Sequence, residues 1–194
     1  MEYFDISKEL FSTEVYPGDP APEKEVFMSI QGGDACNLTI LKMGSHNGTH
    51  MDAPHHFVDE GRTIDQLSLD QVNGPCSVIA VSGTVDREIL KNIMPENCDR
   101  LLLKGDFTLT VDGSAYLAEQ KLKLYGLEAM TVGYGDDGVA IHRTLLGSDM
   151  VILENLMLRD VEEGTYFLCA APLKMAGLDG APCRAFLMRS KVKS

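Results

Sequence analysis

The sequence predicts a single α/β domain with a mixed, barrel-like β core and a few flanking helices. Two observations lead to this fold class. The middle of the chain twice repeats a helical segment, a glycine and an apolar strand, which favours parallel pairing. The first quarter has alternating apolar residues on both sides of Gly32-Gly33-Asp34, a pattern typical of an antiparallel hairpin. The chain contains no repeat and no linker, so we expect residues 1–194 to form one domain.

Strands are expected where short apolar runs lie between turn residues. In chain order these runs are 26–30, 38–41, 76–81, 101–103, 130–132, 150–153, 166–170 and 184–188. Three helices are expected between them. They are 88–93, begun by Asp86 and ended by Pro95; 114–124, begun by Ser114 and ended by Gly126; and 139–146, ended by Gly147.

The composition limits the partners and the setting of the protein. A net charge of -12 argues against nucleic acid and anionic membranes, because both bind positively charged faces. The first residues lack the pattern of a signal peptide, and no apolar stretch is long enough for a membrane-spanning helix. Five cysteines without close pairs predict neither a disulfide framework nor a cysteine metal site. We therefore expect a cytoplasmic protein with a small-molecule substrate.

The densest chemical feature of the sequence is a run that holds four of the five histidines and one aspartate. These residues are His46, His50, Asp52, His55 and His56. Imidazole and carboxylate are ligands of zinc, manganese and iron, so the run predicts a metal site. Positions 46, 50, 52 and 56 share one parity and point to one side of an extended segment, whereas His55 points away. Pro54 predicts that this segment is an edge or irregular strand.

The string His-x-Gly-Thr-His-x-Asp-x-Pro-x-His-Phe runs from His46 to Phe57. It resembles the signature of the cyclase family of metal-dependent hydrolases, which includes bacterial kynurenine formamidase and isatin hydrolase. Further segments are similar to the family, so the resemblance extends over most of the chain. They are the loop Tyr16-Pro17-Gly18-Asp19, the block with His142 and Glu154, and the turn Gly180-Ala181-Pro182-Cys183-Arg184-Ala185.

The resemblance implies two metal sites that share a carboxylate. The ligands would be His46, His50 and Asp52 for one metal, and Asp52, His142 and Glu154 for the other. Glu154 would be able to contact both metals, and His56 would be the catalytic histidine without a metal. Glu154 also directly follows an apolar strand, which is where α/β sheets carry their sites. We expect two zinc ions per chain, with manganese compatible with the same donors.

These parts imply hydrolysis of an amide bond. Two divalent cations about 3.5–4 Å apart lower the pKa of a shared water toward 7, and the resulting hydroxide attacks a carbonyl that one cation polarises. His56 takes a proton from the nucleophile and gives it to the leaving amine. The leading hypothesis is therefore an arylformamidase-like hydrolase of N-formylkynurenine-type substrates, an activity of tryptophan catabolism.

Two departures from the family pattern leave the substrate open. Kynurenine formamidases usually have a tryptophan in the N-terminal aromatic loop, where this chain has Tyr16, which still stacks on aryl rings. Segment 133–138 is short and lacks the Asp-x-x-Ser-x-Asp pattern. One alternative is an isatin hydrolase-like enzyme that opens a lactam or lactone. Another is a non-catalytic binding protein stabilised by a fully ligated metal.

The family resemblance also implies a homodimer or a higher homo-oligomer. Enzymes of this kind complete a pocket with a loop of a neighbouring subunit. The loop around Tyr16 is the candidate for such a contribution.

Overall fold

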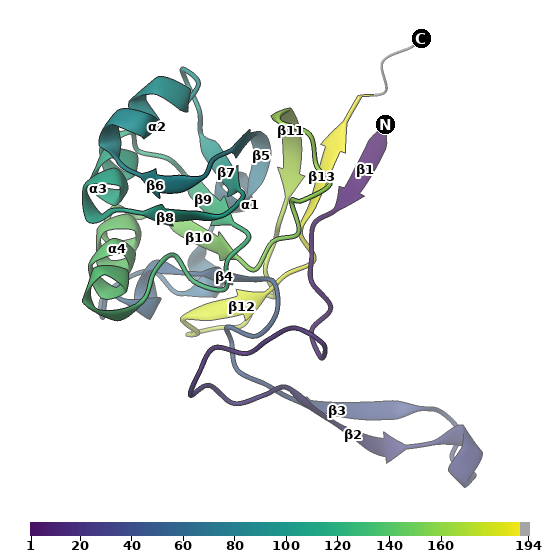
Figure 1. Ribbon diagram of the computed structural model, residues 1–194. Helices are drawn as coiled ribbons and strands as arrows, with labels where there is room; N and C mark the ends of the chain where they lie inside the picture. Colours follow the sequence, from purple (N-terminus) through teal and green to yellow (C-terminus); the bar gives the residue numbers. More distant parts are fainter. Residues whose placement is uncertain (191–194) are drawn as a thin grey trace.

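The computed structural model describes residues 1–190 of the chain. Within these residues the main element is one mixed sheet of nine strands that curls into a half-barrel, in the order β1-β13-β11-β5-β7-β9-β10-β4-β12 (Figure 1). Strands β5, β7, β9 and β10 are parallel neighbours, and the other pairs are antiparallel. The predicted fold class is confirmed. The strands are β1 (Glu2–Asp5), β4 (His50–Asp52), β5 (Asn73–Ala80), β7 (Arg100–Lys104), β9 (Leu124–Leu127), β10 (Val151–Glu154), β11 (Gly164–Cys169), β12 (Gly180–Pro182) and β13 (Phe186–Arg189).

The helices α2, α3 and α4 cover one face of this sheet (Figure 1). In the described part of the chain the α-helices are α1 (Leu69–Val72), α2 (Arg87–Ile93), α3 (Val111–Glu119) and α4 (Gly135–Gly147). The 3-10 helices are η1 (Ile30–Gly32), η2 (Pro54–His56) and η3 (Ile64–Gln66), and β6 (Gly83–Val85) pairs with β8 (Phe107–Leu109). As predicted, Asp86 caps the N-terminus of α2, and its side chain accepts a hydrogen bond from the Ile89 backbone amide.

The apolar core lies on both faces of the sheet, because successive side chains of a strand point to opposite sides. Leu101, Leu103 and Ile152 belong to the cluster under the helices. Leu102 and Leu153 belong to the cluster on the other face. These strands are therefore continuous apolar runs, as parallel strands buried on both faces are. In residues 1–190 no helix is both long enough and apolar enough to cross a bilayer.

Two element assignments in the middle of the chain were wrong. The helix predicted to begin at Ser114 begins at Val111, because Thr110 caps it and accepts a hydrogen bond from the Gly113 amide at 2.9 Å. The strand predicted at 130–132 lies at Leu124–Leu127 instead. Gly126 does not stop a helix there. A Cβ on Gly126 would lie 2.5 Å from Leu102 Cδ2, so the glycine allows close packing within the sheet. Helix α4 also begins earlier than predicted, at Gly135.

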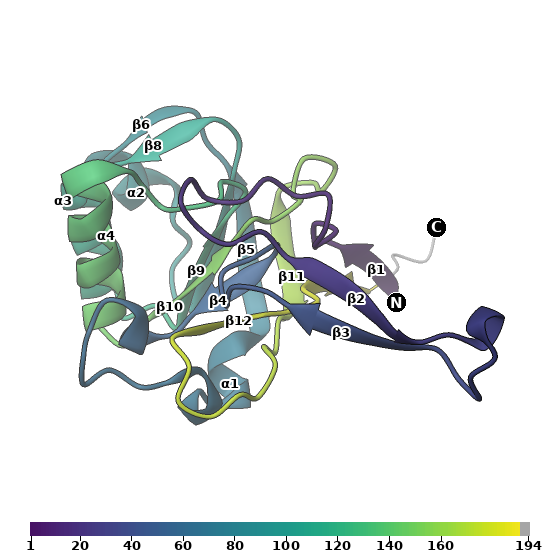
Figure 2. The ribbon, with the colours of Figure 1, turned by 90° about the horizontal axis from the view of Figure 1, so that it is seen from below.

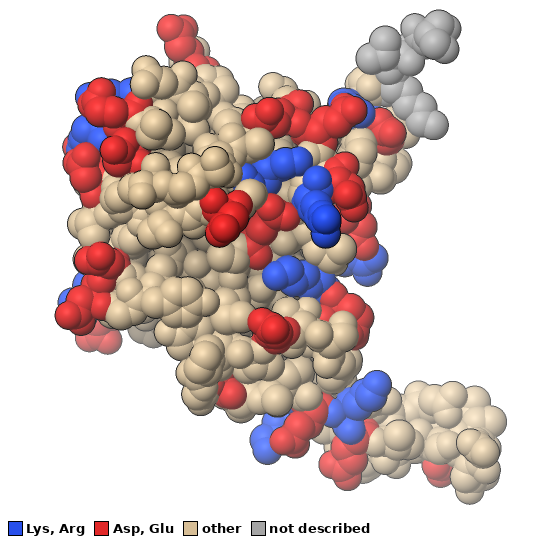
Figure 3. All heavy atoms as spheres, in the orientation of Figure 1, with Lys and Arg blue, Asp and Glu red and all other residues tan. Residues whose placement is uncertain are grey.

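The predicted hairpin forms a separate arm that projects from the body of the protein (Figures 1 and 2). Its strands β2 (Glu23–Met28) and β3 (Leu38–Lys42) pair antiparallel, and η1 lies in the connection between them. Large apolar side chains of the arm are exposed, including Val26 at 70% and Phe27 at 62%. On the face shown in Figure 3, lysines and arginines lie among acidic side chains.

Candidate active site

Strand β4 places His50 and Asp52 on the sheet face that α4 covers. In the ladder with β10, His50 lies opposite Glu154 and Asp52 lies opposite Ile152. Directly paired residues point to the same face, so three polar side chains converge. His50 Nε2 lies 3.3 Å from Asp52 Oδ1 and 3.5 Å from Glu154 Oε2. All three residues are buried, each with at most 3% of its surface exposed. The strand pairing thus builds a buried cluster of one imidazole and two carboxylates.

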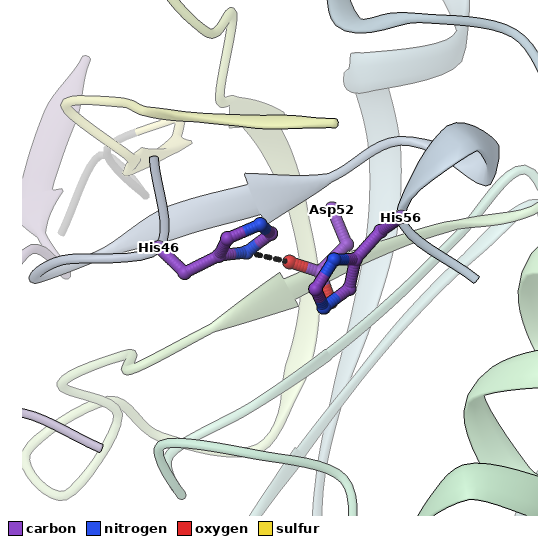
Figure 4. Close-up of side chains that lie close together, drawn as sticks. All are labelled: His46, Asp52 and His56. Atoms are coloured by element: carbon purple, nitrogen blue, oxygen red, sulfur yellow. Dashed lines mark hydrogen bonds and ion pairs between the residues drawn. The ribbon is translucent and has the colours of Figure 1, made fainter. Parts of the chain in front are cut away.

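The other histidines of the motif reach this cluster from outside the strand. The prediction of one extended segment over positions 46–56 is wrong, because His46 lies in a turn and His56 in η2. Strand β4 is not an edge strand either: it lies between β10 and β12, and Pro54 begins η2 instead. His46 Nδ1 nevertheless lies 2.8 Å from Asp52 Oδ1, and His56 lies beside them (Figure 4).

Gly48 explains how the turn brings His46 back to the strand. Its φ of 68° is in the left-handed region, which glycine adopts at no steric cost. The turn also folds His46 against His50, with ring centroids 5.0 Å apart and ring planes nearly perpendicular. On the far side, the His46 ring stacks on His56 at 4.0 Å. His55 points elsewhere, and its Nδ1 lies 2.9 Å from the Asp59 carbonyl oxygen.

Helix α4 supplies His142 to the same cluster. His142 Nε2 lies 3.9 Å from Asp52 Oδ2 and 3.8 Å from Glu154 Oε1. Its Nδ1 donates a hydrogen bond to the Gly138 carbonyl one helical turn earlier, at 2.7 Å, which leaves Nε2 as the nitrogen facing the carboxylates. Phe57 stacks on the His142 ring with centroids 4.3 Å apart. The structure therefore brings His142 to the histidine motif, although the two are far apart in the sequence.

The carboxylate of Glu154 is held in place by the chain segment that follows β9. Its Oε1 accepts a hydrogen bond from the buried Val132 backbone amide at 2.8 Å. Glu154 is the last residue of β10, the position expected from the apolar run before it. The carboxylate therefore has one fixed oxygen, and the other oxygen faces His50.

Burial and charge oppose each other in the cluster. Burial alone would lower the pKa of His46, but its contacts with Asp179 and Asp52 outweigh burial and raise this pKa to about 9. Burial likewise acts to lower the pKa of His50, and the contacts with Asp52 and Glu154 raise it to about 10. Burial acts to raise the pKa of Asp52, but the histidines hold it well below its usual range. Burial, followed by the charge of Asp52, raises the pKa of Glu154.

One buried atom shows what the cluster is suited to hold. Within residues 1–190, Asp52 Oδ2 has no hydrogen-bond partner although it is fully enclosed. A buried carboxylate oxygen without a partner is costly, and a cation would satisfy it. Two sets of residues share Asp52, and within each set the donor atoms lie within 4.8 Å of one another. The first set is His46, Asp52 and His56, and the second is His50, Asp52 and Glu154. Imidazole and carboxylate donors fit zinc or manganese.

The cluster forms the floor of a cavity of about 390 Å³. Apolar side chains such as Phe57, Met130 and Val139 contribute to its wall. Tyr16 lies at the rim, 40% exposed, and its ring stacks on Tyr134 with centroids 5.9 Å apart. Among residues 1–190, no lysine or arginine lines this cavity. The cavity is therefore suited to a small molecule with an aromatic part and without a dominant negative charge.

Every predicted site residue except Asp52 lies at this cavity or at its rim. Asp52 lies directly beneath the cavity, in contact with His46 and His50. Sequence reasoning missed Asp179, which lines the cavity and bonds His46, and Tyr134, which supports Tyr16. Asp179 directly precedes the Gly-Ala-Pro turn that begins at Gly180. Its position next to a segment that resembles the family was the signal that could have indicated it.

Comparison with known proteins places the chain among hydrolases. Residues 4–101 match the family model Cyclase. A kynurenine formamidase of Bacillus cereus is 34% identical, over 96% of this chain and 97% of that protein. Kynurenine formamidase of Erythrobacter litoralis is also 34% identical, over 89% of this chain and 87% of that protein.

Solved structures share the fold over nearly the whole chain. A protein described as a predicted metal-dependent hydrolase from Bacillus stearothermophilus superimposes with a TM-score of 0.82 at 28% identity. The match covers 96% of this chain and 97% of that chain. Isatin hydrolase A from Labrenzia aggregata, bound to benzyl benzoate, has a TM-score of 0.84 at 21% identity, over 98% of this chain and 94% of that chain.

Proposed function

The chain belongs to the cyclase family, and we propose that it is a metal-dependent hydrolase of small aryl amides, with N-formylkynurenine-type formamides as its substrates. The single observation that carries this proposal is the buried Asp52 oxygen without a partner on the floor of an aromatic-rimmed cavity. Kynurenine formamidases that align with almost the entire chain support amide hydrolysis. Hydrolysis of an aryl formamide adds water across the C–N bond and releases formate and an aryl amine.

We propose that two divalent cations bind here, zinc in the first place and manganese as the alternative. The ligands would be His46, His50 and Asp52 for one cation, and Asp52, His142 and Glu154 for the other. The gathering of imidazole and carboxylate donors around Asp52, and the approach of His142 Nε2 to its unpartnered oxygen, support cation binding here, while the division of ligands between the two cations follows the family resemblance. Bound cations of this kind polarise a carbonyl oxygen and lower the pKa of water.

His56 is the proposed general acid and base. Burial lowers its pKa, so the ring is neutral at pH 7 and accepts a proton from the attacking water. The protonated ring then gives this proton to the departing amine nitrogen. About a quarter of its side chain is exposed to the cavity, which gives it access to a substrate, whereas His50 is enclosed.

Tyr16 is the proposed substrate-binding residue. Its ring lies at the cavity rim and is supported by Tyr134 with only 12° between the ring planes. A substrate aryl ring would extend this stack and place its formamide group over the histidines. Phe57 and Val139 line the same cavity and exclude water around the bound amide.

A second candidate is the opening of a neutral lactam such as isatin. It is favoured by the cavity lining, because in the described chain no cationic side chain there offers a counter-charge to the carboxylate of an amino acid. The deciding experiment compares kcat/KM for N-formylkynurenine and isatin on one zinc-loaded preparation. We expect at least tenfold preference for N-formylkynurenine, and the reverse preference would assign the enzyme to lactams. Bound metal without turnover of either substrate would favour a non-catalytic binding protein.

We propose that the protein forms a homodimer or a higher homo-oligomer through the arm β2–β3. An isolated two-stranded hairpin is marginally stable in water, and this one exposes Val26, Phe27 and Leu41. Sedimentation analysis should find a dimer or larger species for the natural chain and monomers for the Phe27→Lys/Leu41→Lys variant. A monomeric natural chain would contradict this assembly. Tyr16 lines the cavity of its own chain.

We further propose that the protein works in the cytoplasm. All five cysteines have free thiols, which is the usual state in a reducing compartment.

A further inference from the structure

Asp179 directly precedes β12, and its carboxylate faces two histidines of the cavity. Oδ2 accepts a hydrogen bond from His46 Nε2 at 2.9 Å and lies 3.5 Å from His56 Nδ1. Oδ1 accepts a hydrogen bond from Ser45 Oγ at 3.1 Å. We propose that Asp179 is a positioning residue that decides which ring nitrogens of His46 and His56 carry hydrogen. The part of this inference that concerns turnover rests on the proposed function.

The position of Asp179 is set by the ladder between β4 and β12. Its carbonyl oxygen accepts a hydrogen bond from the Ala53 amide at 2.8 Å, and the next residue, Gly180, pairs with Asp52. A Cβ on Gly180 would lie 2.6 Å from His46 Cε1, so β12 packs directly on the ring. The carboxylate is therefore attached to the strand that adjoins the cluster, and its distance from His46 is fixed by sheet pairing.

For His46, the contact determines the nitrogen that is free for a cation. An imidazole binds a metal through the nitrogen without hydrogen, and a carboxylate at the other nitrogen retains the hydrogen there. Asp179 faces Nε2, so Nδ1 is the nitrogen directed at the buried cluster. Nδ1 lies 2.8 Å from Asp52 Oδ1, the same oxygen that His50 Nε2 approaches to 3.3 Å. A carboxylate in the position of Asp179 orients the ring and increases its basicity as a ligand.

For His56, the same carboxylate oxygen has a second role. His56 Nδ1 lies at ion-pair distance from Oδ2, and the rings of His46 and His56 are stacked with 29° between their planes. A hydrogen on His56 Nδ1 directed at Asp179 leaves Nε2 to exchange a proton with a substrate. One carboxylate thus couples the orientation of a proposed ligand to that of the proposed acid and base.

The chain offers a matched control in Asp19. This residue also lines the cavity and also carries a carboxylate. It lies in an exposed turn, where its amide donates to the Tyr16 carbonyl, and no bond from Asp19 to a histidine is present within residues 1–190. Replacing either aspartate by asparagine removes one negative charge from the cavity. Only the Asp179 replacement also changes the acceptor that faces His46.

The test is zinc affinity of the chain of residues 1–194, measured after metal removal by competition with a chromophoric chelator. Asp179→Asn should weaken the tighter zinc site about 10–100-fold, the range typical for partners of metal-bound histidines. Asp19→Asn should weaken it less than about threefold, because an exposed charge is screened by salt. At saturating zinc, Asp179→Asn should lower kcat for N-formylkynurenine while KM changes less than about twofold, because orientation of His56 acts on turnover.

A second measurement decides the inference even if the variant fails to fold. Long-range ¹H–¹⁵N spectra of the zinc-loaded natural chain report which nitrogen of each ring carries hydrogen. We expect hydrogen on Nε2 of His46 and on Nδ1 of His56. Hydrogen on Nδ1 of His46, or equal zinc affinity of Asp179→Asn and Asp19→Asn, would overturn the inference. If the natural chain binds zinc but hydrolyses no formamide, the proposed function fails, and affinity and spectra still decide the role of Asp179.

Discussion

The site has a half held by strands and a half held by loops, and the two halves differ in burial. The strand-held half is His50, Asp52 and Glu154, and the half that we call loop-held is His46 in a turn, His56 in η2 and Asp179 in the bend before β12. His142 reaches both halves from α4. The strand-held residues are enclosed, whereas the side chains of the loop-held residues are 17%, 27% and 38% exposed. Strand pairing fixes the spacing of buried charges, which a cation site requires. The exposed half has access to substrate and solvent, which proton transfer requires.

The largest effect is expected from Asp52, the strand-held residue that histidines of both halves approach. Asp52→Asn removes the carboxylate that His46, His50 and His142 approach. Loss of cation binding removes several kcal/mol of transition-state stabilisation, so kcat/KM should fall by about 10⁴-fold or more. Elemental analysis of the same sample should show that the metal content falls as well. Full metal content with near-normal activity would show that the strand-held half does not form the cation site.

Removal of His56 should separate the two halves. His56→Ala should lower kcat by about 10²–10³-fold while the metal content is unchanged, because the ring is assigned to proton transfer. The side chain of the neighbouring His55 has the Asp59 carbonyl as its one polar partner in residues 1–190, so His55→Ala is the control and should retain activity. A loss of metal in His56→Ala would instead make His56 a ligand, in line with its place beside His46 and Asp52.

Packing between the halves can be tested at Gly180. In Gly180→Ala the new Cβ would meet His46 Cε1 at 2.6 Å and the Met51 carbonyl oxygen at 3.0 Å, so the ring must move. We expect about tenfold weaker zinc binding, since a cost of about 1.4 kcal/mol at the ligand corresponds to that factor. A Cβ on Gly147, at the end of α4, would meet no atom within 4 Å, so Gly147→Ala should leave affinity unchanged. Equal affinities of the two variants would contradict this packing.

The smallest effect is expected in the stability of the metal-free protein at high pH. Despite burial, carboxylate contacts raise the pKa of His46 to about 9 and that of His50 to about 10, above the ordinary 6.5. These two groups stabilise the fold fully below about pH 6.5, and their contribution is lost as the pH rises through 9 and 10. Burial raises the pKa of Cys76 and Cys183 to about 12. Their thiols therefore ionise at lower pH in the unfolded chain than in the folded one, which also lowers the stability of the fold as the pH rises.

The comparison with zinc-loaded protein isolates the histidine contribution. The Tm of the metal-free protein should fall by several degrees between pH 7 and 10, as expected for a few kcal/mol in a chain of this length. The zinc-loaded protein should lose less, because bound imidazoles have already released the protons concerned, whereas the contribution of other buried groups such as the thiols is the same in both forms. Calorimetric scans of both forms measure this difference. Parallel pH profiles would mean that His46 and His50 are not coupled to the carboxylates.

The sequence predicts which residues of the two halves gather better than it predicts their local conformation. Donor types and spacing from His46 to His56 indicated the cluster, because few other roles suit so many imidazoles in one run. The conformation was not predictable, since Gly48 in the left-handed region and Pro54 at the start of η2 divide the run into three local structures. Asp179 was missed because its contact with His46 arises only when β12 pairs with β4, far away in the sequence.

Helix boundaries show a similar limit in the core. Both Thr110 and Ser114 are suitable caps for α3, and local pattern does not choose between them. The choice between these two caps depends on tertiary structure, in which Leu124–Leu127 forms a strand of the sheet between β7 and β10. Strands such as β5 and β10 were predicted because each is a short, continuous apolar run bounded by turn residues.

Anomalous diffraction at the zinc absorption edge, from crystals of the zinc-loaded protein, decides whether the cluster holds two cations. We expect two peaks per chain, one bounded by His46, His50 and Asp52 and the other by Asp52, His142 and Glu154. Asp52 would then contribute one oxygen to each. A chain without a peak at this cluster, or with zinc bound only elsewhere, would contradict the assignment of the strand-held half as a cation site.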